Sequence, residues 1–384
     1  MSKLEDLIVE LCPDGVEYKE LMYIVNNIFS GNNKSRNDRG KYPVYGSTGI
    51  IAHTDHFVYD TPLILIARVG AYAGQVNIAN GQYDVSDNTL ILNINSKYNF
   101  YYVYYFLLNI NLNKYAKGGG QPLITATQLK SILIPLPPLP IQEEIVRILD
   151  NFTELTAELT AELTARKQQY EYYRDSLLTF GEDVEWKTLD EIGNFFGGLI
   201  GKSKDDFSNG NRKFISYMNV FSNLSINTKD IDLVKIQEGE KQKIIKNGDI
   251  IFTGSSETPN ECGMSSVFIS DEDEEFYLNS FCFGLRLYDK NLLLPHFSKY
   301  LFRSHELRNQ ITKTASGVTR FNVSKKKMGN VLIPLPPLPI QEEIVRILDN
   351  FTELTAELTA EIDARKQQYE YYRDKLLSFK ERLL

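Results

Sequence analysis

A segment of 49 residues occurs twice in this chain with almost no change, and this repeat constrains the fold more than any other feature. Residues 132–180 align without a gap with residues 331–379 and differ from them only at Ile132/Val331, Leu163/Ile362, Thr164/Asp363, Ser176/Lys375 and Thr179/Ser378. The preceding segments, 1–131 and 181–330, differ strongly from each other. This variable–constant–variable–constant order suggests one repeated partner, held by the constant segments, and two different targets, read by the variable segments.

Each constant segment begins with a proline-rich stretch that cannot be helical. Ile134–Pro140 and Ile333–Pro339 each contain four prolines, which favours an extended, stiff backbone. The last proline suits the first turn of a helix. No proline or glycine then occurs before Phe180, and apolar residues alternate in steps of four and three as in a coiled-coil seam, at Ile141, Ile145, Ile148, Phe152, Leu155 and Leu159.

The seam continues with a second step of four to Leu163, within the tandem Thr-Ala-Glu-Leu units of Thr156–Leu163, and this step predicts a stutter. A helix of about 40 residues is roughly 60 Å long, and a single apolar stripe needs a partner. The other copy is the obvious partner, in either direction. Because the two copies also agree at exposed positions, as in 166–174 and 365–373, we expect more than a structural coiled coil, although recent duplication would also produce such identity.

Composition is compatible with a reduced, cytoplasmic protein of at least two domains. The chain has 384 residues and three cysteines, Cys12, Cys262 and Cys282, without paired ligand spacing. No signal peptide is recognisable and no apolar run is long enough to span a membrane. The net charge is −8, of which segments 132–180 and 331–384 carry −4 and −3. The variable segments are therefore nearly neutral, and local basic patches in them could meet phosphates.

Both variable segments read as α+β. Short β-rich runs followed by glycine-containing loops predict strands, and aromatic-rich runs near the end predict a helix in each segment. The predicted strands are Leu63–Ile66, Leu90–Leu92, Ile250–Phe252 and Phe283–Leu287, and the predicted helices are Phe100–Leu108 and Phe297–Phe302.

Candidate nucleic-acid contacts are basic and amide side chains that form clusters in the variable segments. Arg, Asn and Gln read base edges bidentately, whereas Lys mostly meets phosphate. Any such cluster can also be a plain solvated surface. The candidates are Lys34, Arg36, Asn37, Arg39, Lys41, Arg68, Lys117, Gln121, Lys202, Lys204, Arg212, Lys213, Arg320, Lys325, Lys326 and Lys327.

No catalytic or metal-binding constellation is recognisable. Phe196–Ser203 resembles a phosphate-binding loop, but Phe196 stands where that motif requires glycine. His53 and His56 have a ligand-like spacing without any carboxylate or thiol cluster to complete a site.

The whole chain resembles the specificity subunit of type I restriction–modification systems. The resemblance rests on Ile134–Leu139 followed by Gln142 and a long helix, on the same pattern at Ile333–Leu338 and Gln341, and on the order of the four segments. Many relatives have Glu before that glutamine, where this chain has Ile141 and Ile340.

The resemblance implies two α+β target-recognition domains, 1–131 and 181–330, each reading half of a bipartite site in double-stranded DNA. Segments 132–180 and 331–384 would each supply a proline hinge and a long helix, and the helices would form an antiparallel coiled coil that fixes the distance between the domains. Two methyltransferase subunits would dock on the repeats and restriction subunits would join later; S-adenosylmethionine, ATP and Mg²⁺ belong to those partners.

For the partner surface, the repeats offer Gln142, Arg166, Tyr170, Tyr173, Gln341, Arg365, Tyr369 and Tyr372. The chain itself is thus expected to need no cofactor and to be non-catalytic. The alternative is a coiled-coil scaffold whose flanking domains bind proteins, which would show no preference for DNA.

Overall fold

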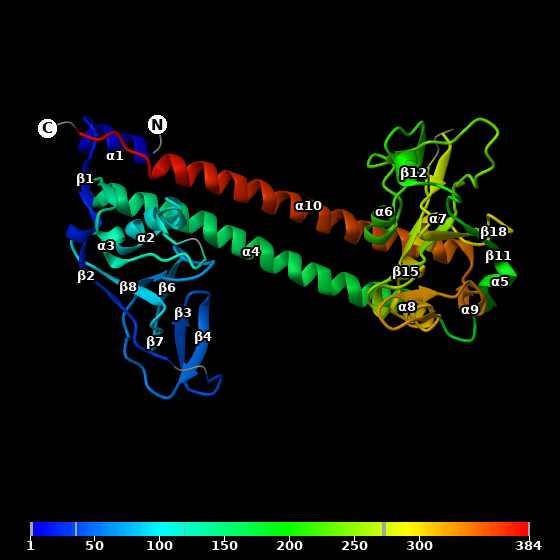
Figure 1. Cartoon of the computed structure of the whole chain (residues 1–384), viewed down its shortest axis with the longest axis horizontal. Coiled ribbons are helices and arrows are strands. Elements are labelled where there is room, and N and C mark those ends of the chain that lie inside the picture. Colours follow the sequence, from blue (N-terminus) through cyan, green and yellow to red (C-terminus); the bar gives the residue numbers. More distant parts are fainter. Residues whose placement is uncertain (1–2, 35–36, 119, 271–273, 383–384) are drawn as a thin grey trace. The chain divides into compact units, whose positions relative to one another are not determined.

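The structure is a computed structural model that describes residues 3–34, 37–118, 120–270 and 274–382. The chain forms two compact units (Figure 1). Unit 1 comprises Met1–Thr160 together with Ala360–Leu384, and unit 2 comprises Ala161–Thr359. Each unit therefore contains one variable segment and a part of both constant segments.

The two predicted long helices are present. Helix α4 spans Leu139–Leu177 and helix α10 spans Leu338–Leu376, and each has 39 residues. Both begin one residue before the last proline of the hinge, in the first turn, where the missing proline N–H has no intrahelical acceptor to lose.

Unit 1 contains a four-stranded antiparallel sheet of order β2-β8-β5-β6, a three-stranded sheet of order β4-β3-β7 and a strand pair β1-β9. Its elements, apart from the long helices, are α1 (Lys3–Leu11), β1 (Glu17–Glu20), β2 (Val25–Ser30), β3 (Tyr42–Gly46), β4 (Gly49–Thr54), β5 (Leu63–Ala67), β6 (Val76–Ala79), β7 (Asp84–Val85), β8 (Thr89–Ile94), α2 (Phe100–Asn109), α3 (Ala126–Lys130) and β9 (Leu133–Leu136).

Unit 2 repeats this plan with sheets of order β11-β18-β14-β16, β13-β12-β17 and β15-β20-β19 and the pair β10-β21. Its elements are β10 (Glu185–Thr188), α5 (Leu189–Ile192), β11 (Gly193–Gly197), β12 (Arg212–Ile215), α6 (Tyr217–Ser222), β13 (Asp232–Val234), β14 (Ile250–Thr253), β15 (Ser255–Ser256), β16 (Ser265–Val267), β17 (Phe276–Leu278), β18 (Cys282–Leu287), α7 (Pro295–Leu301), α8 (His305–Thr312), β19 (Ala315–Ser316), β20 (Phe321–Val323), α9 (Lys325–Met328) and β21 (Leu332–Leu335).

The predicted strands and helices of both variable segments are confirmed. Strands β5 and β14 are buried along their whole length, as expected for continuous apolar runs in the middle of a sheet. Several aromatic residues of α2 and α7 belong to the cores, since Tyr102, Phe297 and Tyr300 are fully buried, whereas Tyr101 is exposed.

The proline hinges are extended, as predicted, and are also paired. Strand β9 runs antiparallel to β1, and β21 runs antiparallel to β10. Proline is tolerated there because each hinge forms a two-stranded ladder in which one side of the strand needs no donor. A strand near the start of each variable segment thus pairs with the hinge that follows the segment, immediately before a long helix.

One buried glutamine in each repeat joins the hinge, the long helix and the variable segment. The Gln142 side chain accepts a hydrogen bond from the N–H of Asn99, the N-cap of α2, at 3.0 Å and donates one to the Pro137 carbonyl at 2.7 Å. Gln341 accepts from the N–H of Leu294, the N-cap of α7, at 2.9 Å and donates to the Pro336 carbonyl at 2.8 Å. Since both glutamines are buried, these bonds are shielded from water.

The two long helices contact each other through two reciprocal aromatic pairs, in each of which a phenylalanine of one repeat stacks on a tyrosine of the other. In unit 1, the ring of Phe152 on α4 stacks on Tyr372 of α10 with centroids 5.6 Å apart. In unit 2, Phe351 on α10 stacks in the same way on Tyr173 of α4 at 5.4 Å. Phe351 and Tyr372 are the repeat equivalents of Phe152 and Tyr173. This exchange requires the helices to run in opposite directions, and it confirms the antiparallel coiled coil.

Replacing Gln142 or Gln341 with leucine leaves a backbone N–H and a carbonyl buried without their partner. We expect each substitution to lower the free energy of unfolding by about 2 to 4 kcal/mol, because each unsatisfied buried group costs roughly 1–3 kcal/mol. Gln168→Leu, on the exposed side of α4, is the matched control and should change stability by less than about 0.5 kcal/mol. Guanidinium denaturation followed by circular dichroism measures the difference; equal effects of Gln142→Leu and Gln168→Leu would contradict it.

Candidate nucleic-acid interface

In unit 1, three loops that carry predicted DNA contacts meet at one edge of the four-stranded sheet. Strands β2 and β5 both pair antiparallel with β8, so both end at the same edge, at Ser30 and Ala67. The loops that follow them contain the described residues 31–34 and 37–41 and residues 68–75. Backbone bridges from Leu123 to Val69 and Lys117 hold a third loop, the hairpin 116–123, at this edge.

Unit 2 has the same edge. Strands β11 and β14 both pair antiparallel with β18 and end at Gly197 and Thr253. Strand β15 follows β14 directly and pairs with β20, which in turn pairs with β19. The hairpin formed by β19 and β20 therefore occupies, within unit 2, the place that hairpin 116–123 occupies within unit 1.

The described residues of these two hairpins correspond at the same offset, 199, that relates the two repeats. Lys117 pairs with Leu123 as Ser316 pairs with Asn322. Gly118 and Gly317 have φ angles of +113° and +154°, which L side chains rarely adopt. A Cβ on Gly317 would also lie only 1.9 Å from the Arg320 carbonyl oxygen, so the turn excludes a side chain there.

At the tip of the hairpins, this offset aligns Gln121 with Arg320. Both side chains are exposed. Arg320 donates a hydrogen bond from Nε to Ser255 Oγ at 3.2 Å, and its guanidinium lies 5.5 Å from the centre of the Phe281 ring. Two contacts thus hold the inner side of this guanidinium in place.

The remaining predicted contacts of the first variable segment lie mostly on the surface of the edge loops. Exposed side chains are Lys34, Asn37, Arg39, Lys41 and Lys117. The Asn37 side chain accepts from the Arg39 N–H at 3.0 Å, which shapes the loop, and Lys41 Nζ lies 5.0 Å from the centre of the Tyr42 ring. Arg36 lies outside the described residues.

Arg68 is positioned differently, because it is half-buried at the end of β5. Its Nη1 donates to Ser30 Oγ at 3.4 Å, whereas its Nε is buried and has no hydrogen-bond partner within the described part of the chain. Its carbonyl accepts from the Ile124 N–H at 2.9 Å. Arg68 thus links β2 to the segment around Ile124 through these two contacts. Because it is half-buried, it presents little of its guanidinium to a ligand.

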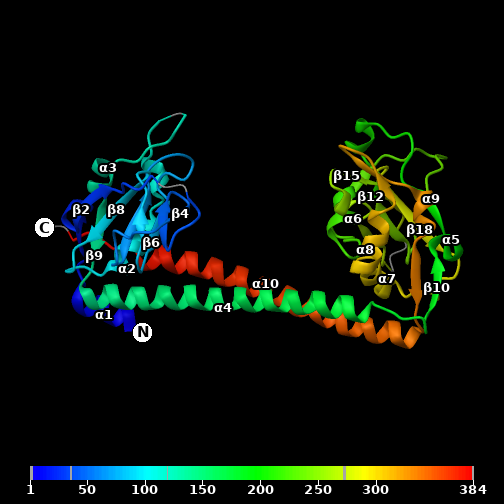
Figure 2. The same cartoon turned by 90° about the horizontal axis from the view of Figure 1, so that it is seen from below.

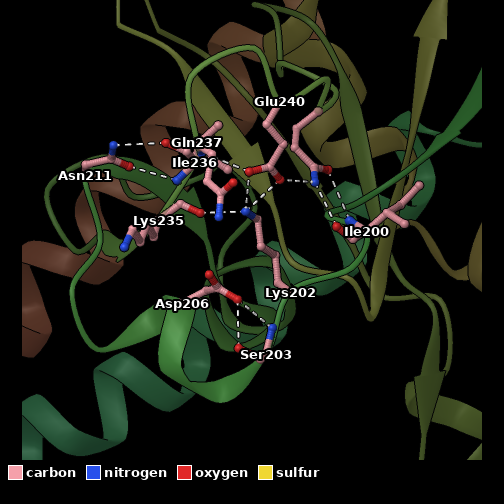
Figure 3. Close-up of polar contacts among 10 residues, drawn as sticks. Ile200, Lys202, Ser203, Asp206, Asn211, Lys235, Ile236, Gln237 and Glu240 are labelled. Carbon is pink, nitrogen blue, oxygen red and sulfur yellow. Dashed lines mark hydrogen bonds and ion pairs between the residues drawn. The ribbon is translucent and has the colours of Figure 1, made fainter.

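Lys202 does not fit the predicted phosphate contact (Figure 3). Its side chain is 7 % exposed, and its Nζ lies 2.6 Å from both the Glu240 carboxylate and the Lys235 carbonyl. This hydrogen bond, with others from Gln237 and Gln242, lowers the pKa of Glu240 to about 2. The charge of Lys202 is therefore compensated inside the domain, which the spacing of the sequence could not reveal.

Arg212 and Lys213 are also paired within the chain. Arg212 Nε lies 3.8 Å from Glu275, and Lys213 forms an ion pair with Glu274. Both sit on β12, the middle strand of the three-stranded sheet β13-β12-β17. By contrast, Lys204, Lys325, Lys326 and Lys327 are exposed, and Lys325 Nζ would lie 3.8 Å from a Cβ placed on Gly197, at the sheet edge.

A cavity beside Arg320 adds residues that the sequence did not single out. Its volume is about 450 Å³, and its lining includes Tyr217, Phe281 and Glu257. Phe281 is 57 % exposed. Tyr217 donates from its hydroxyl to the Ser255 carbonyl at 2.7 Å, which fixes its ring beside the loop. No periodicity or motif marks these residues, because they come from three separate parts of the chain: the start of α6, the segment after β15 and the turn before β18.

The predicted partner-binding residues of the repeats fall into three groups. Gln142 and Gln341 are buried and engaged in the hinges, so they offer no surface to a partner. Tyr170, Tyr173, Tyr369 and Tyr372 lie against the opposing long helix within their units. Arg166 and Arg365 pair along the helix surface with Glu162 and Glu361, at 3.5 and 3.4 Å.

The tyrosines that face outward are the neighbours of the predicted ones. Tyr172 is 71 % exposed and Tyr371 is 62 % exposed. The two are equivalent in the repeat, so both units present the same aromatic side chain on the outside of the coiled coil. Helical spacing could have distinguished them, since they fall one residue off the apolar seam.

The phosphate-loop resemblance has no matching geometry. Gly201 adopts φ +70°, but only a four-residue 3-10 helix, Lys204–Phe207, follows it, and Lys202 is engaged with Glu240. Within the described ranges, no three His, Cys, Asp or Glu residues are close enough together to hold a metal ion. Nor does any helix of those ranges combine the length and apolarity needed to cross a bilayer.

Comparison with known proteins identifies relatives over most of the chain. The sequence pattern of the "type I restriction modification DNA specificity domain" matches residues 14–166 and 181–365. A type I restriction enzyme specificity subunit of Escherichia coli is 37 % identical over 299 residues, which are 72 % of this chain and 70 % of that protein. A putative specificity subunit of Haemophilus influenzae is 30 % identical over 382 residues, covering 95 % and 96 % of the two chains.

The fold has a solved counterpart. The crystal structure of the S subunit of a type I restriction–modification system from M. genitalium superposes with a TM-score of 0.58 at 16 % identity, covering 94 % of this chain and 96 % of that one. The pattern of the specificity domain matches the chain twice, once in each half, and the chain belongs to the family of type I restriction–modification specificity subunits.

Proposed function

We propose that this chain reads an asymmetric, bipartite site in double-stranded DNA, with one half-site for each variable segment. The observation that carries the proposal is the pair of matched sheet edges, each of which presents the same hairpin with a different side chain at its tip. Identical scaffolds with different reading residues are what two different half-sites require. The scaffold alternative is not favoured, because the family is one of DNA specificity.

Catalysis is assigned to other subunits. The repeats supply two outer surfaces of nearly identical sequence, and we assign them to two methyltransferase subunits, which restriction subunits join in the full complex. The chain then needs no cofactor of its own, and it acts in the cytoplasm, where the DNA is. The recognition domains correspond to 1–131 and 181–330 and the docking segments to 132–180 and 331–384.

The different tip residues suggest what the two domains read. Arginine binds guanine bidentately through O6 and N7, and glutamine binds adenine bidentately through N6 and N7. We assign Arg320 to a guanine in one half-site and Gln121 to an adenine in the other. Exposed lysines of the same edges, such as Lys34 and Lys326, would meet phosphates, which position the domain without specifying bases.

Exchange of the recognition domains tests the division into half-sites. The strand pairs β1-β9 and β10-β21 suggest the boundaries, so residues 184–335 are replaced with a second copy of residues 16–136. The expected product, assembled with its methyltransferase, methylates an interrupted palindrome of one half-site, and the reciprocal exchange yields the palindrome of the other. Sequencing of methylated DNA reads both motifs. Retention of the original asymmetric motif in either chimera would contradict the assignment of one half-site to each variable segment.

The tip residues are tested by Arg320→Gln, with the other half-site as an internal control. One base of a single half-site should change from guanine to adenine, because a bidentate contact contributes about 1–3 kcal/mol of discrimination, or roughly 5- to 150-fold. A plasmid library with every base at each position measures this preference.

Lys326→Ala is the matched control for Arg320→Gln. It should weaken DNA binding without altering any base preference and should reduce the slope of log affinity against log salt by about 1. If Arg320→Gln leaves all base preferences intact, Arg320 is not a reading residue.

A further inference from the structure

The two repeats differ in how their first helical turns are covered, although their sequences are identical there. Ile141 in unit 1 is 0 % exposed, whereas its equivalent in unit 2, Ile340, is 46 % exposed. The Glu144 side chain is 3 % exposed, and that of Glu343 is 55 % exposed. Because the residues are the same, the difference comes from what packs on them.

In unit 1, the N-terminal helix α1 covers this face (Figures 1 and 2). Lys3 Nζ lies 2.7 Å from Glu144 Oε2, and Leu4 belongs to the same buried cluster as Ile141. Leu4 and Ile8, one turn apart on α1, line a groove of about 630 Å³ with residues of α4 and α10. Helix α1 thus places an apolar stripe and a cation on the start of α4.

In unit 2, the same face stays open. We call Ile340 and Glu343 the open face. Glu343 pairs with Arg346 at 2.6 Å, just as Glu144 pairs with Arg147 at 2.6 Å. That contact lies within the helix and leaves Glu343 half exposed beside Ile340. An exposed isoleucine next to an acidic side chain is suited to another amphipathic helix that carries a cation.

We propose that α1 occupies, in unit 1, the position that a helix of a methyltransferase subunit takes on the open face of unit 2. The occupied copy shows the chemistry of the partner helix: apolar residues four apart, as Leu4 and Ile8 are, and a basic residue beside them, as Lys3 is. The proposal rests on the function proposed above, in which the repeats dock two methyltransferases.

The two docking surfaces then have the same sequence, but α1 covers the one in unit 1 and leaves the one in unit 2 open. The first methyltransferase binds the open face. The second must displace α1 from Ile141 and Glu144, which costs part of its binding free energy. Assembly is therefore stepwise, and the two dissociation constants differ by more than the statistical factor for two equal sites.

Titration of the full chain with its methyltransferase subunit, followed by native mass spectrometry, measures both steps. Lys3→Glu places a second carboxylate against Glu144 and loosens α1 without changing either repeat. It should tighten the second step by at least about fivefold and leave the first unchanged. Removal of residues 2–11 should act in the same direction and more strongly.

Two further variants separate the steps. Ile340→Glu, at an exposed position, should weaken the first step and spare the fold. Val9→Glu is the matched control on α1, because Val9 is 64 % exposed, and it should change neither step. A second step that stays unchanged in both Lys3→Glu and the truncated chain would overturn the inference, as would a first step that tolerates Ile340→Glu. If no variant, nor the native chain, binds the methyltransferase, the proposed function itself fails.

Discussion

The antiparallel pairing of two nearly identical helices is the constraint on which the rest of the structure depends. Each helix has one apolar stripe, and in each unit the copy running the other way covers it through a stack of phenylalanine on tyrosine, Phe152 on Tyr372 and Phe351 on Tyr173. The two phenylalanine–tyrosine pairs are equivalent under the repeat. The contacts between hinge, helix and variable segment that one repeat makes are therefore made again by the other. The buried glutamines then transmit this geometry to the recognition domains, since each bonds to the N-cap of a domain helix.

The variable domains diverge on this constant frame without changing their plan. Both build a four-stranded antiparallel sheet whose edge collects loops from distant parts of the segment, and both close that edge with a hairpin at the same offset as the repeats. Substitution is restricted at the glycines that shape the hairpin, Gly118 and Gly317, and is free at the tip. A new specificity therefore requires different tip and loop residues, while the sheet, the hinge and the helix remain.

The sequence predicted the elements that follow from periodicity and composition. The long helices, the extended hinges and the central strands β5 and β14 carry apolar patterns that only one kind of element satisfies. The site was less predictable, because charge compensation depends on tertiary contacts. Lys202 has the same local character as Lys204, yet Glu240, distant in sequence, neutralises it. The burial of the repeats could not be predicted either, because it depends on what packs against each copy: Ile141 is covered and Ile340 is exposed.

Mapping of methylated positions in the genome of cells that express this chain with its methyltransferase tests the central claim most directly. Two different recognition domains on one antiparallel frame predict a single motif, with two unlike half-sites separated by a fixed number of unspecified bases. Deletion of the gene should abolish methylation at every such site. A palindromic motif, a contiguous motif or methylation without any sequence preference would contradict the assignment of one half-site to each domain.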